Sequence, residues 1–284
     1  MIRPLRSTSR AFSLAEVLMA LLVGAIALVG SVAMFWLYIS HYERIEFSSR
    51  ARMRAEEAVA VLQDWVLNAA VGVSADKPSK AFPGVSTLGS WNDLVEVVDS
   101  SRKLRLVYGV PSGITVISVD RPSVPPGEVV KIEVTDPLPA DLYAVSPATL
   151  KGWLVFPSGN LPLRIDSVSG KTLSLSNPHS EDVFVVPFDE VFYPRALVAE
   201  QKDGQLYVED VSLGAPQPRT GVGYADIRFL LSQGVLTLHV LSRGDGPGRG
   251  LPSTWPSSFG TSISSDDQKG YLMHVRTSWR LRNR

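Results

Sequence analysis

The chain has 284 residues, of which 45% are hydrophobic and 20% charged, and its 28 basic residues balance its 28 acidic ones. This apolar fraction is that of a folded protein, and the balanced charge argues against a general nucleic-acid binder. The chain contains no cysteine, which excludes a disulfide framework, a thiolate metal site and a cysteine nucleophile.

Helix-breaking residues are distributed unevenly along the chain. Only Pro4 of the 20 prolines precedes Pro78, and Gly24 and Gly30 are the only glycines between residues 12 and 70. Proline and glycine are dense in the remainder. This pattern predicts an α+β protein, with one long N-terminal helix followed by a body of mostly antiparallel strands and turns.

A long apolar run follows a short basic start. Three arginines and no acid lie in residues 1–10, and Ser31 alone interrupts the apolar run 17–39. At about 1.5 Å per residue, this run is long enough to span the roughly 30 Å hydrocarbon core of a membrane. Three interpretations fit: a secretory signal cut near residues 31–33, a plain signal anchor, or a helix in which Glu16 has a task of its own.

Glu16 is the unexpected residue of this segment. A carboxylate costs up to about 2.5–3.5 kcal/mol near the membrane centre and less near the interface. A plain anchor has no use for such a group, so Glu16 indicates that a cationic group meets it inside the membrane. The positive-inside rule does not fix the orientation, because arginines mixed with glutamates also follow the span in residues 43–57. The very short N-terminal tail favours a cytoplasmic N-terminus.

The segment AFSLAEVL, residues 11–18, resembles the cleavage and methylation motif of type IV prepilins. The resemblance implies that prepilin peptidase cuts between Ala11 and Phe12 and methylates the new amino group of Phe12. Glu16 then becomes the fifth mature residue, where this family keeps a glutamate. Two features depart from the family: Ala11 replaces the usual glycine, and the helix lacks the proline of many pilins, for which Gly30 would be the soft point.

This resemblance implies a minor pilin or pseudopilin that is assembled into, or primes, a type IV pilus or a type II secretion pseudopilus. The Glu16 carboxylate would pair with the N-terminal amine of a neighbouring subunit and set the register of the filament. The implied partners are prepilin peptidase, other pilins or pseudopilins through the N-terminal helix, and the assembly platform in the inner membrane. The implied location is a single pass through the cytoplasmic (inner) membrane, with the C-terminal body outside the cytoplasm and a place at the filament tip.

The alternative is a single-pass, membrane-anchored, β-rich binding protein that enters no filament. Its body would recognise a ligand at the membrane surface.

The chain is expected to divide into a leader (1–11), a transmembrane half-helix (12–39), an amphipathic half-helix (40–75) and a β-rich periplasmic body (76–284). The amphipathic half carries an apolar stripe at three- and four-residue spacing, which predicts that it rests on the β body. The stripe consists of Ala55, Val59, Leu62, Val66 and Ala69, flanked by Ala58 and Trp65. The arginines at 44, 50, 52 and 54 are interpreted as a solvated face beside glutamates.

The body shows short strand-type runs separated by turn residues. Among them, 104–108 and 114–119 are expected as separate strands, as are 191–193 and 197–201. Residues 76–89 are expected to form a linker or surface loop, 120–194 an inserted β subdomain and 243–265 a flexible loop. Three hairpins are predicted, with turns at 169–170, 202–204 and 232–234. Parts of the body resemble the larger minor pilins of the PilW kind and the J-type pseudopilins of type II secretion.

Few residues indicate chemistry. His239 and His274 lie in predicted strands and could be neighbours, but no third metal ligand accompanies them. Asp266 and Asp267 are too few for a calcium site, and the glycine-rich run 244–250 lacks the ending of a phosphate-binding loop. We therefore expect no enzyme, no catalytic or metal-binding residue and no cofactor, and no nucleic-acid partner.

Overall fold

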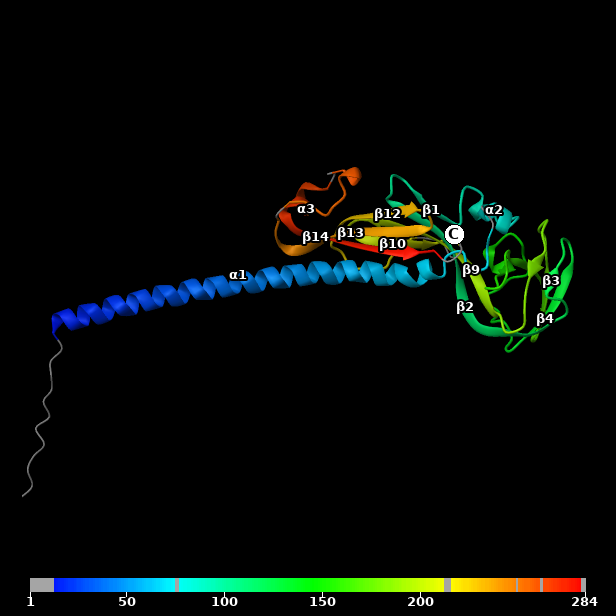
Figure 1. Ribbon diagram of the computed structural model, residues 1–284, viewed down its shortest axis with the longest axis horizontal. Helices are drawn as coiled ribbons and strands as arrows, with labels where there is room; N and C mark the ends of the chain where they lie inside the picture. Colours follow the sequence, from blue (N-terminus) through cyan, green and yellow to red (C-terminus); the bar gives the residue numbers. More distant parts are fainter. Residues whose placement is uncertain (1–12, 75–76, 212–215, 249, 261–262, 282–284) are drawn as a thin grey trace, which may run out of the picture. The chain divides into compact units, whose positions relative to one another are not determined.

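The computed structural model describes residues 13–74, 77–211, 216–248, 250–260 and 263–281. They fall into two units, of which the first ends at Ser48 and the second begins at Ser49. The predicted α+β class is confirmed: a long N-terminal helix contacts a large antiparallel sheet, and a smaller three-stranded sheet accompanies it (Figure 1).

Helix α1 runs without a break from Leu14 to Leu67, as the absence of proline predicts. It ends where the side-chain amide of Asn68 donates back to the carbonyl of Asp64, at 3.0 Å, and where Ala70, shortly after Leu67, adopts a φ of 52°. A left-handed residue just beyond a helix end is the usual way to terminate the helical path.

The second part of α1 packs on the body as an amphipathic helix. Its buried side chains are Ala51, Ala55, Ala58, Leu62 and Val66. All of these except Ala51 share one hydrophobic core with strands of both sheets. The stripe was predicted with Val59 at its centre and Ala58 at its flank. The structure reverses these two, because Ala58 is buried and Val59 only partly so.

The strands are short in most of the body and long in four places. They are β1 (Val95–Val98), β2 (Lys103–Val119), β3 (Ser123–Val124), β4 (Val129–Val134), β5 (Trp153–Leu154), β6 (Leu163–Ser169), β7 (Thr172–Ser176), β8 (Val183–Phe184), β9 (Glu190–Lys202), β10 (Gln205–Asp210), β11 (Gln217–Pro218), β12 (Tyr224–Ser232), β13 (Val235–Pro247) and β14 (Gly270–Arg280). Short helices are α2 (Pro78–Ala81), η1 (Ser86–Leu88), η2 (Leu150–Gly152), η3 (Ser257–Phe259) and α3 (Ser265–Lys269).

In the described part of the chain these strands form three antiparallel sheets. The nine-stranded sheet has the order β11-β10-β9-β2-β4-β7-β6-β5, with β1 also paired to β2. The three-stranded sheet has the order β12-β13-β14, and β3 pairs with β8. The predicted hairpins β6–β7, β9–β10 and β12–β13 are confirmed.

Strands β2 and β9 correct the sequence analysis, which split each of them at proline and glycine. They pair side by side from Lys103–Glu200 to Thr115–Glu190 (Figure 1). At their middle, Gly109 faces Pro194, and the N–H of Gly109 donates to Asn68 O at 3.0 Å. This pair therefore exchanges no hydrogen bond between the two strands, and the missing N–H of Pro194 costs nothing there.

The predicted linker 76–89 is instead packed. It contains α2 and η1, and Phe82 is fully buried with its ring edge-on to Trp153 at 5.8 Å. The predicted loop 243–265 also starts later than expected, because β13 continues to Pro247. A separate core gathers buried residues between Ile114 and Tyr193, within and just before the segment 120–194.

Candidate functional site

Helix α1 begins with reciprocal hydrogen bonds between Ser13 and Glu16. The backbone N–H of Ser13 donates to Glu16 Oε2 over 2.9 Å, and the backbone N–H of Glu16 donates to Ser13 Oγ over 3.2 Å. The Ser13 hydroxyl also donates to Oε2, at 3.1 Å. This is a capping box, in which a serine and a glutamate three residues later satisfy N–H groups at the helix start. Glu16 thus has a local role that the sequence analysis missed, although the S-x-x-E spacing was legible.

Only one of the two carboxylate oxygens takes part in the capping box. Oε2 accepts both local bonds, whereas Oε1 has no donor within the described residues. The carboxylate therefore keeps one free oxygen that a cationic group from outside could approach. The other two predicted site residues, Ala11 and Phe12, lie outside the described residues, so their processing stays a prediction.

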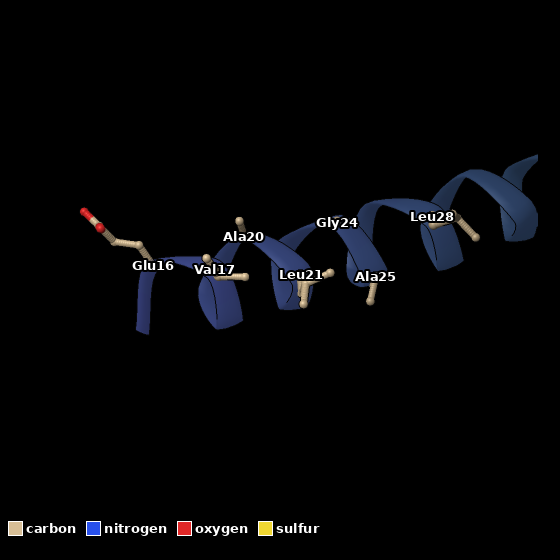
Figure 2. Close-up of a pocket in the computed structure, with 7 residues that line it drawn as sticks. All are labelled: Glu16, Val17, Ala20, Leu21, Gly24, Ala25 and Leu28. Atoms are coloured by element: carbon tan, nitrogen blue, oxygen red, sulfur yellow. The ribbon is translucent and has the colours of Figure 1, made fainter. Parts of the chain in front are cut away.

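Glu16 stands at the end of a face that includes small side chains. Glu16, Ala20, Gly24 and Leu28 follow one another at four-residue spacing along the helix (Figure 2). A shallow hollow opens beside Gly24, and it is lined by Glu16, Val17, Ala20, Leu21, Gly24, Ala25 and Leu28. Small residues allow a second helix to approach closely.

The surrounding helix is apolar and exposed. Every described side chain from residue 13 to residue 38 is exposed, and α1 contains a stretch long and apolar enough to cross a membrane. Membrane anchors and signal sequences share this feature.

Asp245, in β13, forms ion pairs that connect the start of the second unit to the three-stranded sheet. It pairs with Arg50 at 2.7 Å and with Arg54 at 3.3 Å, and Arg54 also donates to the carbonyl of Arg243. The hydrogen bond from Arg50 is the main cause of a lowered Asp245 pKa. The interpretation of these arginines as a solvated face therefore holds for the exposed Arg50 and Arg52, of which Arg52 pairs with Glu56 along the helix at 2.8 Å, but not for the partly buried Arg54.

His239 and His274 are neighbours, as the sequence analysis considered. His239 Nδ1 lies 3.0 Å from His274 Nε2, and the ring planes differ by 2°. The ring centroids are 5.2 Å apart, which exceeds the nitrogen distance by about one ring width, so the rings meet edge to edge. Trp255 and Phe259 cover His239.

The environment of these two histidines lowers the pKa of both rings. Burial, then His274 and Arg276, lower the pKa of His239 to about 4. The described residues contain no group of three or more side chains that could hold a metal ion.

Asp266 and Asp267 have cationic partners of their own chain. Asp266 pairs with Lys269 at 3.0 Å, and Asp267 pairs with Arg243 at 3.1 Å. The Asp267 carboxylate also accepts from the hydroxyl of the helix cap Ser264, and the backbone N–H of Asp267 donates to that hydroxyl. These carboxylates stabilise the loop before β14.

Comparison of the chain with protein-family models, with curated proteins and with solved structures gives no match. The function is therefore inferred from the residues and the geometry described above.

Proposed function

We propose that the chain is a minor pilin or pseudopilin, processed by prepilin peptidase and built into, or priming, a type IV pilus or a type II secretion pseudopilus. One observation carries this proposal: the Glu16 carboxylate, with one oxygen that has no donor among the described residues, stands at the start of an apolar stretch whose side chains at 13–38 are all exposed. The helix continues unbroken into an amphipathic part that packs on a β body. This combination supports a subunit that stacks through its N-terminal helix.

In the proposed filament, Glu16 Oε1 accepts a hydrogen bond from the methylated, positively charged N-terminal amine of a neighbouring subunit. The two opposite charges meet in a dry bundle of helices, where an unpaired carboxylate would be costly. The small residues at positions 20 and 24 let the neighbouring helix come close. The role is structural, without a catalytic residue, a cofactor or a metal.

The size of the body favours a low-copy position. It holds several hydrophobic cores beyond the one that seats α1, and such bulk suits a filament tip better than a repeating shaft. The body then lies outside the cytoplasm, and the assembly platform is the partner in the inner membrane.

N-terminal sequencing and intact-mass measurement of the protein from its host test the proposal. We expect a mature chain that begins at methylated Phe12 in a strain with active prepilin peptidase, and an uncut chain when the peptidase is deleted. Retention of residues 1–11 in the active strain would refute the proposal.

The second candidate is a membrane-anchored binding protein outside any filament. The capping box favours it, because Ser13 gives Glu16 a use that needs no neighbouring subunit. The leader would then be retained, and the protein would fractionate with the membrane rather than with sheared filaments.

A further inference from the structure

Phe188, between β8 and β9, has an unusual backbone. Its φ is 71°, in the left-handed region that a bulky aromatic residue rarely adopts. The residues with positive φ at other described turns include the polar Asp203 and Gln233. Strain of this kind persists only where the surroundings enforce it, and it is frequent at functional sites.

Three backbone hydrogen bonds enforce this conformation. The N–H of Phe188 donates to Val116 O at 2.8 Å, and the N–H of Val116 donates to Asp189 O at 2.8 Å. The N–H of Asp189 donates to Val186 O at 3.3 Å, and its carboxylate accepts the hydroxyl of Ser158. The loop is therefore fixed to β2 on both sides of Phe188.

The ring of Phe188 is not packed in a core of its own chain, since the residue is 87% exposed. Two further apolar residues next to these hydrogen bonds are exposed. Ile117 follows Val116 in β2 and is 47% exposed, and Val186, in the loop, is 37% exposed. We name Ile117, Val186 and Phe188 the apolar corner. Below it, Val116 and Val185 are buried in the core, so the corner rests on a rigid base.

Carboxylates accompany the apolar corner. Asp189 accepts from Ser158, Glu190 from the N–H of Gly113 at 3.0 Å, and Glu133 from the hydroxyl of Ser118 at 3.4 Å. Within the described residues, none of these three carboxylates forms an ion pair with a lysine or arginine. Glu133 shares the exposed face of β4 with Lys131, whereas Asp189 and Glu190 directly follow Phe188 in the chain. Two negative charges therefore adjoin Phe188, which opposes an anionic lipid surface and favours a basic partner.

We propose that the apolar corner is a docking point for another protein, which presents an apolar pocket bordered by lysine or arginine. An aromatic side chain on a rigid, exposed loop loses little conformational freedom when it enters a pocket, and such residues commonly dominate binding energy. The negative charges around it speed the encounter with a basic rim. This docking point does not depend on the role of Glu16.

Site-specific photocrosslinking in the host identifies the partner. The full chain carries p-benzoylphenylalanine at position 188, and a control carries it at Val145, which is 59% exposed and not part of the corner. We expect one protein that crosslinks from position 188 and not from position 145. Crosslinks to lipid only, or equal crosslinking from both positions, would overturn the proposal.

Binding of the purified partner then decides whether the ring is the anchor. We expect Phe188→Gly to weaken binding by about tenfold or more, while Val145→Ala leaves it unchanged. Salt raised from about 0.05 to 0.5 M should also weaken binding by wild type. Unchanged affinity of Phe188→Gly would refute the proposal, even if a crosslink had formed.

The same variant tests whether the strain serves folding. Glycine accepts a φ of 71° without strain, so we expect Phe188→Gly to melt at the same temperature as wild type or a higher one. A lower melting temperature would assign the ring to folding rather than docking.

Discussion

At the scale of single residues, Glu16 has one observed role, in helix capping, and one proposed role, in filament assembly. Its Oε2 closes the capping box with Ser13, whereas its Oε1 is free of donors in the described part of the chain. Removal of the side chain disrupts both tasks at once, so alanine alone cannot separate assembly from helix capping. Glutamine keeps an acceptor oxygen for the cap and loses only the charge.

A set of three variants separates the two tasks of Glu16. We expect Glu16→Gln and Glu16→Ala to insert into the membrane but to incorporate poorly into filaments, because both lack the charge. Ser13→Ala removes the cap and keeps the charge, so it should still assemble. Immunoblots of membrane and sheared-filament fractions measure this. Normal assembly of Glu16→Gln, with Glu16→Ala and Ser13→Ala equally impaired, would show that only capping matters.

The histidine pair predicts a pH dependence of stability. The pKa of His239 falls from 6.5 to about 4 in the folded chain, so the unfolded chain binds more protons between these pH values. The neutral His239 ring contributes fully to the free energy of unfolding above about pH 6.5. This contribution, up to about 3 kcal/mol, is lost as the pH falls towards 4. Thermal unfolding in detergent at pH 7 and 5 should therefore show a smaller loss for His239→Gln than for wild type. Equal losses in both proteins would contradict this account.

At the scale of elements, close approaches of the backbone decide which glycines are essential. Gly72, in the connection that follows α1, has a φ of 62°, and a Cβ there would lie 2.1 Å from Phe156 O. Gly170, in the β6–β7 turn, has a φ of 58° but nothing within 4 Å of such a Cβ. The two positions share their backbone conformation and differ in the space around them.

Alanine at these two glycines should therefore have unequal effects. We expect Gly170→Ala to destabilise by about 1–2 kcal/mol, the cost of a left-handed residue. Gly72→Ala should destabilise by more than about 3 kcal/mol, because backbone must also move. Urea unfolding of the detergent-solubilised chain measures the free energy of unfolding of both variants. If the two lose similar amounts, the backbone contact between residues 72 and 156 is not rigid.

Strands β2 and β9 show why element boundaries were harder to predict than element types. Proline and glycine usually end a strand, and the sequence analysis divided both strands at such residues. The strands nevertheless continue, since Gly109 and Pro194 occupy a pair that exchanges no hydrogen bond. Which pairs of residues lack hydrogen bonds depends on the register between strands, and a single sequence does not reveal the register.

At the scale of the whole molecule, the two units predict the behaviour of truncated chains. The apolar residues 14–38 belong to the first unit, whereas the buried residues of α1 from Ala55 to Val66 belong to the core of the second. A chain that starts at Ser49 should therefore be soluble without detergent and unfold cooperatively.

A shorter truncation provides the control. A chain that starts at Asn68 lacks the stripe and exposes the apolar residues that α1 covers, so it should aggregate. Size-exclusion chromatography and thermal unfolding measure both chains. A soluble, cooperative chain from Asn68 would show that α1 is not part of the core.

The sequence by itself determined the features that depend on local pattern. Helix breakers predicted one long helix and a β body, apolar spacing predicted the packed face of α1, and turn residues predicted three hairpins. The capping box was also legible, because its two residues lie three apart and act within one helical turn.

Only the tertiary structure decided the features that join distant segments. Three such features depend on residues far apart in the sequence. They are the ion pairs of Arg50 and Arg54 with Asp245, the packing of Phe82 on Trp153, and the exposure of Phe188. A charged, aromatic or glycine-rich segment has the same composition whether it is solvated or packed. Its neighbours in space decide between the two, and they are set by strand register and by the packing of the cores.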